Sequence, residues 1–248
     1  MGHTILFNSC LNATQKNCGR ANLAFDFIIL VYTKTSKMST HYYLSAKLWQ
    51  TGVAHICQQD PQLATIIRQY PGRLHPHNRP FETLLRAIIG QQISVVAATK
   101  LWKKLSTDVL ITPAALLALP ISILRQYGLS HAKAACIHQA AAYCQSISAP
   151  DYFKTHPVSR IKAELLAIKG IGPWTVDMFL IFHVNHANII PLGDIGLLHA
   201  VKSVYALALS QRDLSHWIQA HAARYWHPFG TIATWYLWRT IDPEIIIY

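Results

Sequence analysis

Acidic residues are scarce in this sequence: 11 aspartates and glutamates stand against 22 lysines and arginines, for a formal net charge of +11. A surface with so few carboxylates favours a polyanionic partner such as nucleic acid, although many basic proteins have no such partner. The small number of acidic residues also limits the candidates for a catalytic carboxylate. A reaction that needs a carboxylate has few candidates, and they can be compared one by one.

Cysteine patterns typical of metal centres are missing. The five cysteines form no C-x-x-C pair and no zinc spacing, which fits a reduced cytoplasmic setting in which Cys57, Cys136 and Cys144 fill core or helix positions. Two pairs of histidines are closely spaced, but neither has a convincing third ligand, so we expect no metal site. These pairs are His183 with His186 and His216 with His221.

Long hydrophobic runs are missing as well. The apolar run Phe27–Tyr32 is too short to span a membrane, and no signal-peptide pattern precedes it, so we expect no membrane partner. Residues 1–37 differ in character from the rest. We expect them to be a non-native or disordered extension before a natural start at Met38; the alternative is a genuine extension that adds an edge strand. The remainder, 38–248, predicts one globular domain.

Apolar residues with helical spacing dominate the chain after His41, and no internal repeat or convincing sheet is visible. Proline- and glycine-containing breaks separate these stretches into helices of ordinary length. The sequence therefore predicts an all-α fold. The clearest expected helices cover 63–70, 81–89, 95–105, 131–147, 161–168, 174–184 and 195–206.

One stretch, Leu165–Met178, predicts a helix, a tight hairpin and a second helix. Gly170 can adopt the positive φ that ends a helix, and Gly172 permits a second unusual backbone geometry or the close approach of another chain. Pro173 suits the first turn of the next helix, where its missing N–H costs nothing. Backbone N–H groups at such a helix start bind anions, and in DNA the anion is a phosphate.

A second motif follows about twenty residues later, where Asp194 precedes an amphipathic run. Aspartate is a preferred N-cap residue, so a capping role alone would explain it. The combination of motifs, however, resembles the helix-hairpin-helix DNA glycosylase superfamily, and most closely its 3-methyladenine DNA glycosylase II branch. The resemblance covers the chain from about Met38 onward and rests on Arg79–Ser94, Ile168–Met178, Pro191–Asp194 and Ala233–Arg239.

This resemblance implies a two-lobed, all-α helix-hairpin-helix glycosylase fold with the active-site cleft between the lobes and the hairpin at 161–184. Asp194 matches the catalytic aspartate of the family, which stabilises positive charge on the sugar as the N-glycosidic bond breaks. Among rival acids, Glu164 and Asp177 are expected at surface or capping positions, and Glu82 could line the cleft.

The resemblance also indicates the reaction type and the substrate. Relatives that cut the DNA strand carry a lysine where this chain has Trp174, so we expect a monofunctional enzyme that uses water as its nucleophile. Trp174 and Trp238 are expected in the base pocket, where indole would stack on a positively charged alkylated purine; for each, a position in the core is the alternative. Trp235 and Tyr236 are expected mostly in the core. Met178 stands in the pocket where some relatives have an aromatic residue.

Residues expected to bind DNA come from two places. Lys169, Gly170, Ile171 and Gly172 would hold backbone phosphate, and Gln92 is a candidate for the side chain that fills the gap left by a flipped base. A helix-capping or buried-amide role for Gln92 is an equal alternative.

The expected activity is release of alkylated purines such as 3-methyladenine and 7-methylguanine from duplex DNA, the first step of base-excision repair. The alternatives are another glycosylase specificity, for uracil or a mismatched base, and a non-catalytic DNA-binding module.

Expectations for cofactors and location follow from the same resemblance. Some relatives hold an iron–sulfur cluster on four cysteines after the hairpin, which this chain lacks there, so no cofactor is expected. Hairpin carbonyls could hold a monovalent cation. We expect a monomer that works on double-stranded DNA containing damaged bases. It would lie in the cytoplasm with the nucleoid if the source is bacterial, or in the nucleus if it is eukaryotic.

Overall fold

Helices make up nearly all the regular structure of the computed structural model, which describes residues 43–149 and 151–242. In these ranges the β-type pairing is confined to an isolated bridge between Tyr43 and His186. The predicted all-α class is therefore confirmed. The expectations for residues 1–37 and for a start at Met38 lie outside the described residues.

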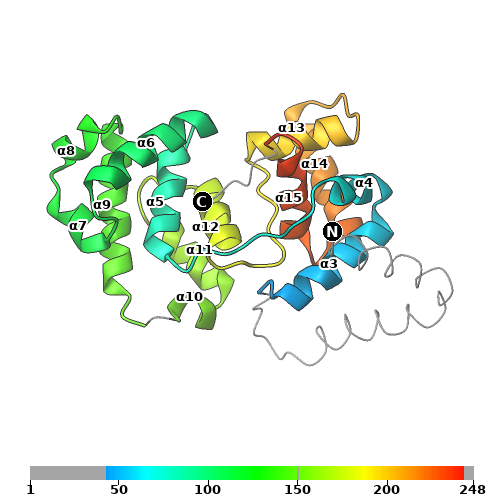
Figure 1. Cartoon of the computed structure of the whole chain (residues 1–248), viewed down its shortest axis with the longest axis horizontal. Helices are drawn as coiled ribbons and strands as arrows, with labels where there is room; N and C mark the ends of the chain where they lie inside the picture. The colour runs from blue at the N-terminus through cyan, green and yellow to red at the C-terminus, as the bar shows by residue number, and fades with distance from the viewer. Residues whose placement is uncertain (1–42, 150, 243–248) are drawn as a thin grey trace, which may run out of the picture. The chain divides into compact units, whose positions relative to one another are not determined.

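Most helices follow one another along the chain with short connections, and two longer segments, 70–79 and 183–194, join α4 to α5 and α12 to α13 (Figure 1). They are α3 (Ala46–Gln59), α4 (Pro61–Gln69), α5 (Pro80–Gly90), α6 (Val95–Asp108), α7 (Pro113–Ala118), α8 (Ile121–Gln126), α9 (His131–Ser146), α10 (Tyr152–Thr155), α11 (Val158–Leu166), α12 (Pro173–Phe182), α13 (Ile195–Val204), α14 (Gln211–His221), the π-helical turn η1 (Ala222–Trp226) and α15 (Gly230–Arg239).

Helix starts are fixed by short polar side chains that accept a hydrogen bond from a backbone N–H group in the first turn. Proline in the first turn supports several of them, because its missing N–H would have no partner there. The sequence thus sets where these helices begin. Examples of the capping residues are Ser45, Asp60, Ser94, Thr112, Ser130, Asp194 and Ser210.

Packing divides the described helices into two groups. The main helix–helix contacts of α5 to α9 and of α11 and α12 are with one another, and those of α3, α4, α13, α14, η1 and α15 are likewise with one another. The second group thus combines the first and last helices of the chain, and Figure 1 shows the same division. The chain leaves this group after α4, builds the other group, and returns after α12.

The hairpin between α11 and α12 has the expected conformation at one glycine and not at the other. Gly170 has φ +96°, and a Cβ there would lie 3.1 Å from the Cβ and Sγ atoms of Cys136 on α9, so both its conformation and its packing require glycine. Gly172 has φ −103° and ψ 176°, which any residue adopts, so of the two alternatives for this glycine the unusual backbone geometry is absent and the close approach of another chain remains. A Cβ at Gly172 would meet no protein atom within 4 Å.

A polar network that the sequence did not reveal lies inside the second group. Asp60, which is 3% exposed, accepts hydrogen bonds from the side chains of Tyr205, His221 and Trp226 and from the backbone N–H of Leu63. Burial alone would raise the pKa of Asp60, but these four hydrogen bonds together outweigh it and lower the pKa to about 2. One carboxylate thus joins α4, α13, α14 and η1.

We expect this network to make folding stability depend on acid. Because the pKa of Asp60 falls from 3.8 to about 2 on folding, its contribution is complete above pH 4 and is lost as the pH falls toward 2. That contribution is about 2 kcal/mol. Urea unfolding of Asp60→Asn should show a loss of at least this size at pH 7 and a smaller decrease between pH 4 and 2 than the wild type. Asp151→Asn, at an exposed aspartate, is the control, and identical pH profiles for Asp60→Asn and the wild type would contradict the assignment.

Candidate active site

Asp194 lies where the two helix groups meet. It is the N-cap of α13, and its Oδ1 atom accepts a hydrogen bond from the backbone N–H of Leu197 at 2.7 Å. The capping role suggested by the sequence is thus present. The carboxylate nevertheless has further partners, and capping does not account for them.

Two indole N–H groups donate to the same carboxylate from opposite groups. Trp174 Nε1, on the first turn of α12, lies 2.7 Å from Asp194 Oδ2. Trp238 Nε1, on the last helix α15, lies 2.9 Å from Asp194 Oδ1. Because an indole N–H can only donate, each ring fixes one oxygen of the carboxylate. Three residues singled out from three separate motifs therefore form one hydrogen-bonded cluster.

The loop that carries Asp194 is held against α15 by hydrogen bonds that are buried or partly buried. Thr231 Oγ1 donates to the carbonyl of His186 and accepts from the N–H of Ile189. Asn188 Oδ1 accepts from the N–H of Gly230. A Cβ at Gly230 would lie 2.7 Å from Ile190, so this glycine is what allows the loop to approach the helix closely. The position of Asp194 is thus set by packed structure and not by a free loop.

The rival acids lie in other environments. Glu82 pairs with Arg79 and Arg86 near its own helix. Glu164 accepts hydrogen bonds from Tyr143, Tyr152 and Arg160. These partners occupy both carboxylates within the first helix group.

Asp177, on α12, is more buried than the sequence suggested. Burial raises its pKa to about 6, while Lys162, whose Nζ atom lies 3.9 Å from Oδ1, acts in the opposite direction. Asp194 accepts hydrogen bonds from two indole N–H groups, and the partners given above for Glu82, Glu164 and Asp177 include no indole.

The expected pocket residues differ in how far they are accessible. Trp174 is half-buried, whereas Trp238 is 7% exposed and stacks on Phe182, with ring centroids 5.8 Å apart and an interplanar angle of 7°. Met178 is 1% exposed and packs in the core, so it contributes almost no accessible surface to the site. Trp235 and Tyr236 are also buried, as expected.

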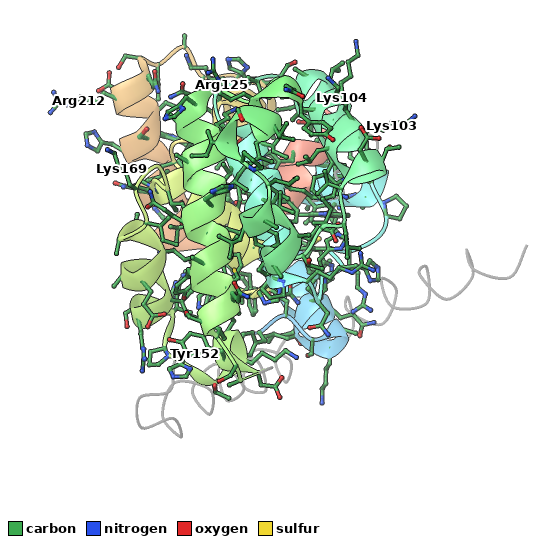
Figure 2. The ribbon with its side chains drawn as sticks, turned by 90° about the vertical axis from the view of Figure 1, so that its left-hand side faces the viewer. Lys103, Lys104, Arg125, Tyr152, Lys169 and Arg212 are labelled. Carbon is green, nitrogen blue, oxygen red and sulfur yellow. The ribbon has the colours of Figure 1, made fainter. Side chains whose placement is uncertain are left out.

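The hairpin presents donors and positive charge. Lys169 is exposed, and Figure 2 shows its side chain at the outer edge of the view. No described residue accepts a hydrogen bond from the backbone N–H of Gly172, Trp174 or Thr175, as is usual in the first turn of a helix. These groups and the open space at Gly172 are the features needed to bind an anion.

Gln92 occupies the turn between α5 and α6. It is exposed and has φ +56°, an unusual conformation for a residue other than glycine. Three apolar side chains beside it are also exposed: Ile93 at 38%, Val95 at 51% and Val96 at 65%. The buried-amide alternative for Gln92 is therefore wrong, and Ser94, not Gln92, caps α6.

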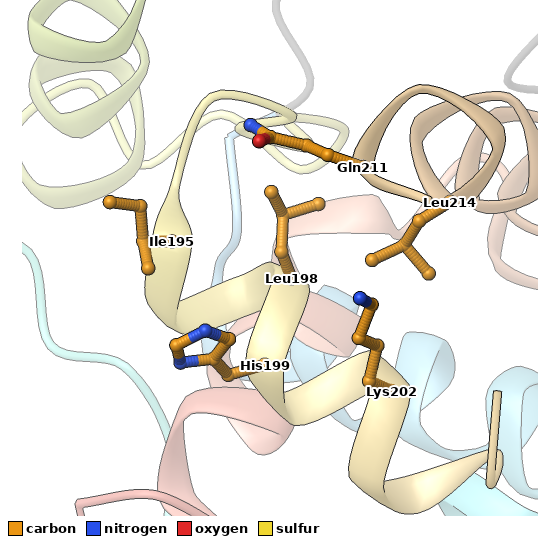
Figure 3. A pocket seen from close by; sticks show the side chains of 6 residues that line it. All are labelled: Ile195, Leu198, His199, Lys202, Gln211 and Leu214. Atoms are coloured by element: carbon orange, nitrogen blue, oxygen red, sulfur yellow. The ribbon is translucent and has the colours of Figure 1, made fainter. Parts of the chain in front are cut away.

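A separate cavity of about 210 Å³ lies between α13 and α14, as Figure 3 shows. One of its lining residues, Ile195, directly follows Asp194, but none of the expected base-pocket residues lines it. Its lining combines apolar and basic side chains. They are Ile195, Leu198, His199, Lys202, Gln211 and Leu214.

Metal and membrane features can be described for residues 43–149 and 151–242 alone. Within these ranges, no three His, Cys, Asp or Glu side chains come close enough together to hold a metal ion. No helix there has both the length and the apolarity that a bilayer crossing needs. The carbonyl of Gly170, a candidate ligand for a monovalent cation, accepts a hydrogen bond from Gln91.

Part of this chain matches a known protein family. Residues 85–226 match the model of the HhH-GPD superfamily of base excision DNA repair proteins. The match covers more than half of the sequence and includes the hairpin and Asp194. The chain belongs to this superfamily.

Individual relatives point to one branch of it. The chain is 28% identical over 186 residues to DNA-3-methyladenine glycosylase 1 of Schizosaccharomyces pombe, covering 72% of this chain and 80% of the relative. It is also 28% identical over 172 residues to the alkylbase DNA glycosidase-like protein mag2 of the same organism, covering 66% and 79%. These relatives confirm the predicted 3-methyladenine branch and an enzyme of the DNA glycosylase type.

Solved structures agree on the fold. The DNA-3-methyladenine glycosidase of Bacillus halodurans superposes with a TM-score of 0.63 at 27% identity, covering 77% of this chain and 89% of that one. The 3-methyladenine DNA glycosylase Mag1 of S. pombe, solved in complex with abasic DNA, gives a TM-score of 0.68 at 24% identity, covering 76% and 95%. The HhH-GPD glycosylase fold predicted from the sequence is confirmed.

Gly196 tests the geometry around Asp194 without replacing any of its hydrogen-bond donors. A Cβ there would lie 3.1 Å from Asp194 Oδ1 and 3.7 Å from Trp238 Cδ1, so Gly196→Ala should displace Oδ1 and weaken the Trp238 hydrogen bond. Folding stability should change little, because the higher helix propensity of alanine, worth up to about 1 kcal/mol over glycine, offsets the weakened hydrogen bonds of Oδ1. The indole N–H resonance of Trp238 should shift in NMR spectra, and that of Trp226, bonded to the remote Asp60, should not. An unmoved Trp238 resonance would contradict the packing.

Proposed function

We propose that this protein hydrolyses the N-glycosidic bond of alkylated purines in duplex DNA, such as 3-methyladenine and 7-methylguanine, and so begins base-excision repair. The observation that carries the proposal is the carboxylate of Asp194, held by two indole N–H groups and one backbone N–H. Family membership gives the class of reaction. The hydrogen bonds give the residue that would perform it.

The role of Asp194 follows from the charge that develops during cleavage. As the base leaves, positive charge accumulates on the sugar, and a fixed carboxylate nearby stabilises that charge more than it stabilises the neutral substrate. Oδ1 accepts two hydrogen bonds and Oδ2 accepts one. A carboxylate oxygen can accept more than one hydrogen bond, so Oδ2 keeps capacity to orient an attacking water.

The two tryptophans take different parts in the proposal. The N–H of Trp174 is used by Asp194, and the ring is half-buried, so an exposed part of its π face can stack on an alkylated purine carrying positive charge. Trp238 has one face against Phe182 and little exposed area. We therefore assign Trp238 mainly to holding Asp194 in place, with less direct contact with the base than the sequence suggested.

Binding to DNA would use the hairpin and the turn before α6. The free N–H groups after Gly172, together with Lys169, would hold backbone phosphate, and the net charge of +11 supports a polyanionic partner. Gln92 and the exposed apolar side chains beside it would enter the gap left by the flipped base. The structure of the relative Mag1 in complex with abasic DNA supports DNA as the partner.

Replacement of Asp194 tests the enzyme against a module that only binds DNA. Asp194→Asn keeps the size of the side chain but removes its charge, and release of methylated bases from alkylated duplex DNA should fall roughly 100-fold or more. Binding to an abasic duplex should persist. Asp177→Asn, at a half-buried aspartate on α12 whose ion-pair partner is Lys162 and not an indole N–H, is the matched control and should stay active.

The other outcomes of this assay identify the alternatives. Equal activity in the wild type and Asp194→Asn would contradict the catalytic assignment. A wild type that releases uracil or a mismatched base, but no alkylated purine, would indicate a different glycosylase specificity. A wild type inactive on all of these substrates would indicate a DNA-binding module.

The reaction should also stop at the abasic site. The position at which strand-cutting relatives carry a lysine holds Trp174, whose side chain cannot form a Schiff base. We expect the strand to remain intact until alkali is added, and borohydride to trap no covalent complex between protein and DNA. A trapped adduct would show that an amine elsewhere attacks the sugar and that the enzyme is not monofunctional.

A further inference from the structure

Gln91 links the two parts of the molecule that we propose touch DNA. Its Nε2 atom lies 2.9 Å from the carbonyl oxygen of Gly170 in the hairpin and 2.9 Å from Thr175 Oγ1 on α12. A carbonyl oxygen can only accept, so the amide NH₂ of Gln91 must face it. These residues are 79 and 84 positions away in the sequence, so the contact is a tertiary link.

The other side of Gln91 is held equally firmly. Lys133 on α9 donates from Nζ to the carbonyl oxygens of Ile89 at 2.7 Å and of Gln91 at 2.8 Å. These carbonyls end α5, where the helix leaves acceptors without internal partners. Burial lowers the pKa of Lys133. The backbone of Gln91 is therefore fixed by α9 while its side chain is fixed by the hairpin.

The next residue is Gln92, exposed and at φ +56°. A left-handed conformation at a residue other than glycine is unfavourable and persists where surrounding contacts hold it. The turn is closed by its own hydrogen bond, from the N–H of Ile93 to the carbonyl of Gly90 at 3.5 Å, and the contacts of Gln91 fix this turn relative to the hairpin. They place the exposed turn at a fixed height relative to the N–H groups at the start of α12.

We infer that Gln91 is a positioning residue that couples the phosphate-binding hairpin to the turn entering the duplex. With the coupling intact, binding of a phosphate by the hairpin places Gln92 and its apolar neighbours at the correct depth for base flipping. Without it, the hairpin still binds phosphate, but the hydrogen bonds of Gln91 no longer fix the position of the turn relative to the hairpin. The inference rests on the proposed function, because it assumes that this turn enters the duplex.

Substitution of Gln91 should therefore alter flipping more than binding. Gln91→Leu removes both donated hydrogen bonds at similar size. It should bind undamaged duplex within about twofold of the wild type while losing roughly tenfold of its preference for an abasic duplex. Gln91→Glu should lose at least as much, because a carboxylate would face the carbonyl of Gly170. Gln62→Leu, at an exposed glutamine on α4, is the neutral control.

Two further variants separate coupling from general damage. Thr175→Val should give a smaller loss, and the double variant with Gln91→Leu should be no worse than Gln91→Leu alone, because both changes remove the same link. Gln139→Leu removes the acceptor for the N–H of Lys169, 3.2 Å away, and should change affinity for both duplexes alike. Its preference for the abasic duplex should match that of the wild type.

Rescue by an unpaired target gives the sharpest test. An alkylated base in a bulge costs less to flip, so the excision defect of Gln91→Leu, roughly tenfold on paired duplex, should shrink to about twofold there. An equal defect on both substrates, or an unchanged abasic preference, would overturn the inference. The binding preference needs no catalysis, so a wild type that prefers abasic DNA but releases no base would contradict the proposed function and leave the Gln91 test intact. A wild type without that preference would overturn the inference.

Discussion

The carboxylate of Asp194 joins the two helix groups through the hydrogen bonds that it accepts. It accepts from α12 in one helix group, from α15 in the other, and from the helix that it caps. Two of these donors are indole N–H groups, which are rigid and cannot reverse their role. The carboxylate of Asp194 is thereby held in one position between the two helix groups. Such preorganisation is what allows a charge to stabilise a transition state without rearranging.

The surrounding structure supplies the precision that this arrangement needs. Threonine and asparagine side chains fasten the loop before Asp194 to α15, and glycines at 196 and 230 leave the space for close approach. The Asp60 network joins the helices of the same group from the inside. On the side that we propose contacts DNA, Gln91 provides the corresponding link between hairpin and turn.

The sequence predicted α4, α5, α6, α9 and α11 to α13, the positive φ of Gly170 and the residues of the Asp194 cluster, because each depends on a local pattern or on a motif; no range was predicted for α3, α7, α8 or α14. It did not predict that Trp174 and Trp238 donate to Asp194, since a motif names a residue but not its hydrogen bonds. The Asp60 network joins residues 145 to 166 positions apart, and no local pattern carries that information. The hydrogen bonds of Gln91 span 79 and 84 positions, so local pattern does not reveal them either. The burial of Met178 likewise depends on tertiary packing.

Binding of charged and neutral sugar mimics tests directly whether the Asp194 carboxylate stabilises positive charge on the sugar. Two duplexes would be compared, one with a cationic pyrrolidine and one with a neutral tetrahydrofuran in place of the damaged nucleotide. If a fixed carboxylate stabilises positive charge on the sugar, the wild type binds the pyrrolidine duplex more tightly, and Asp194→Asn abolishes that difference. Equal binding of both duplexes by the wild type, or a preference that survives in Asp194→Asn, would contradict the account.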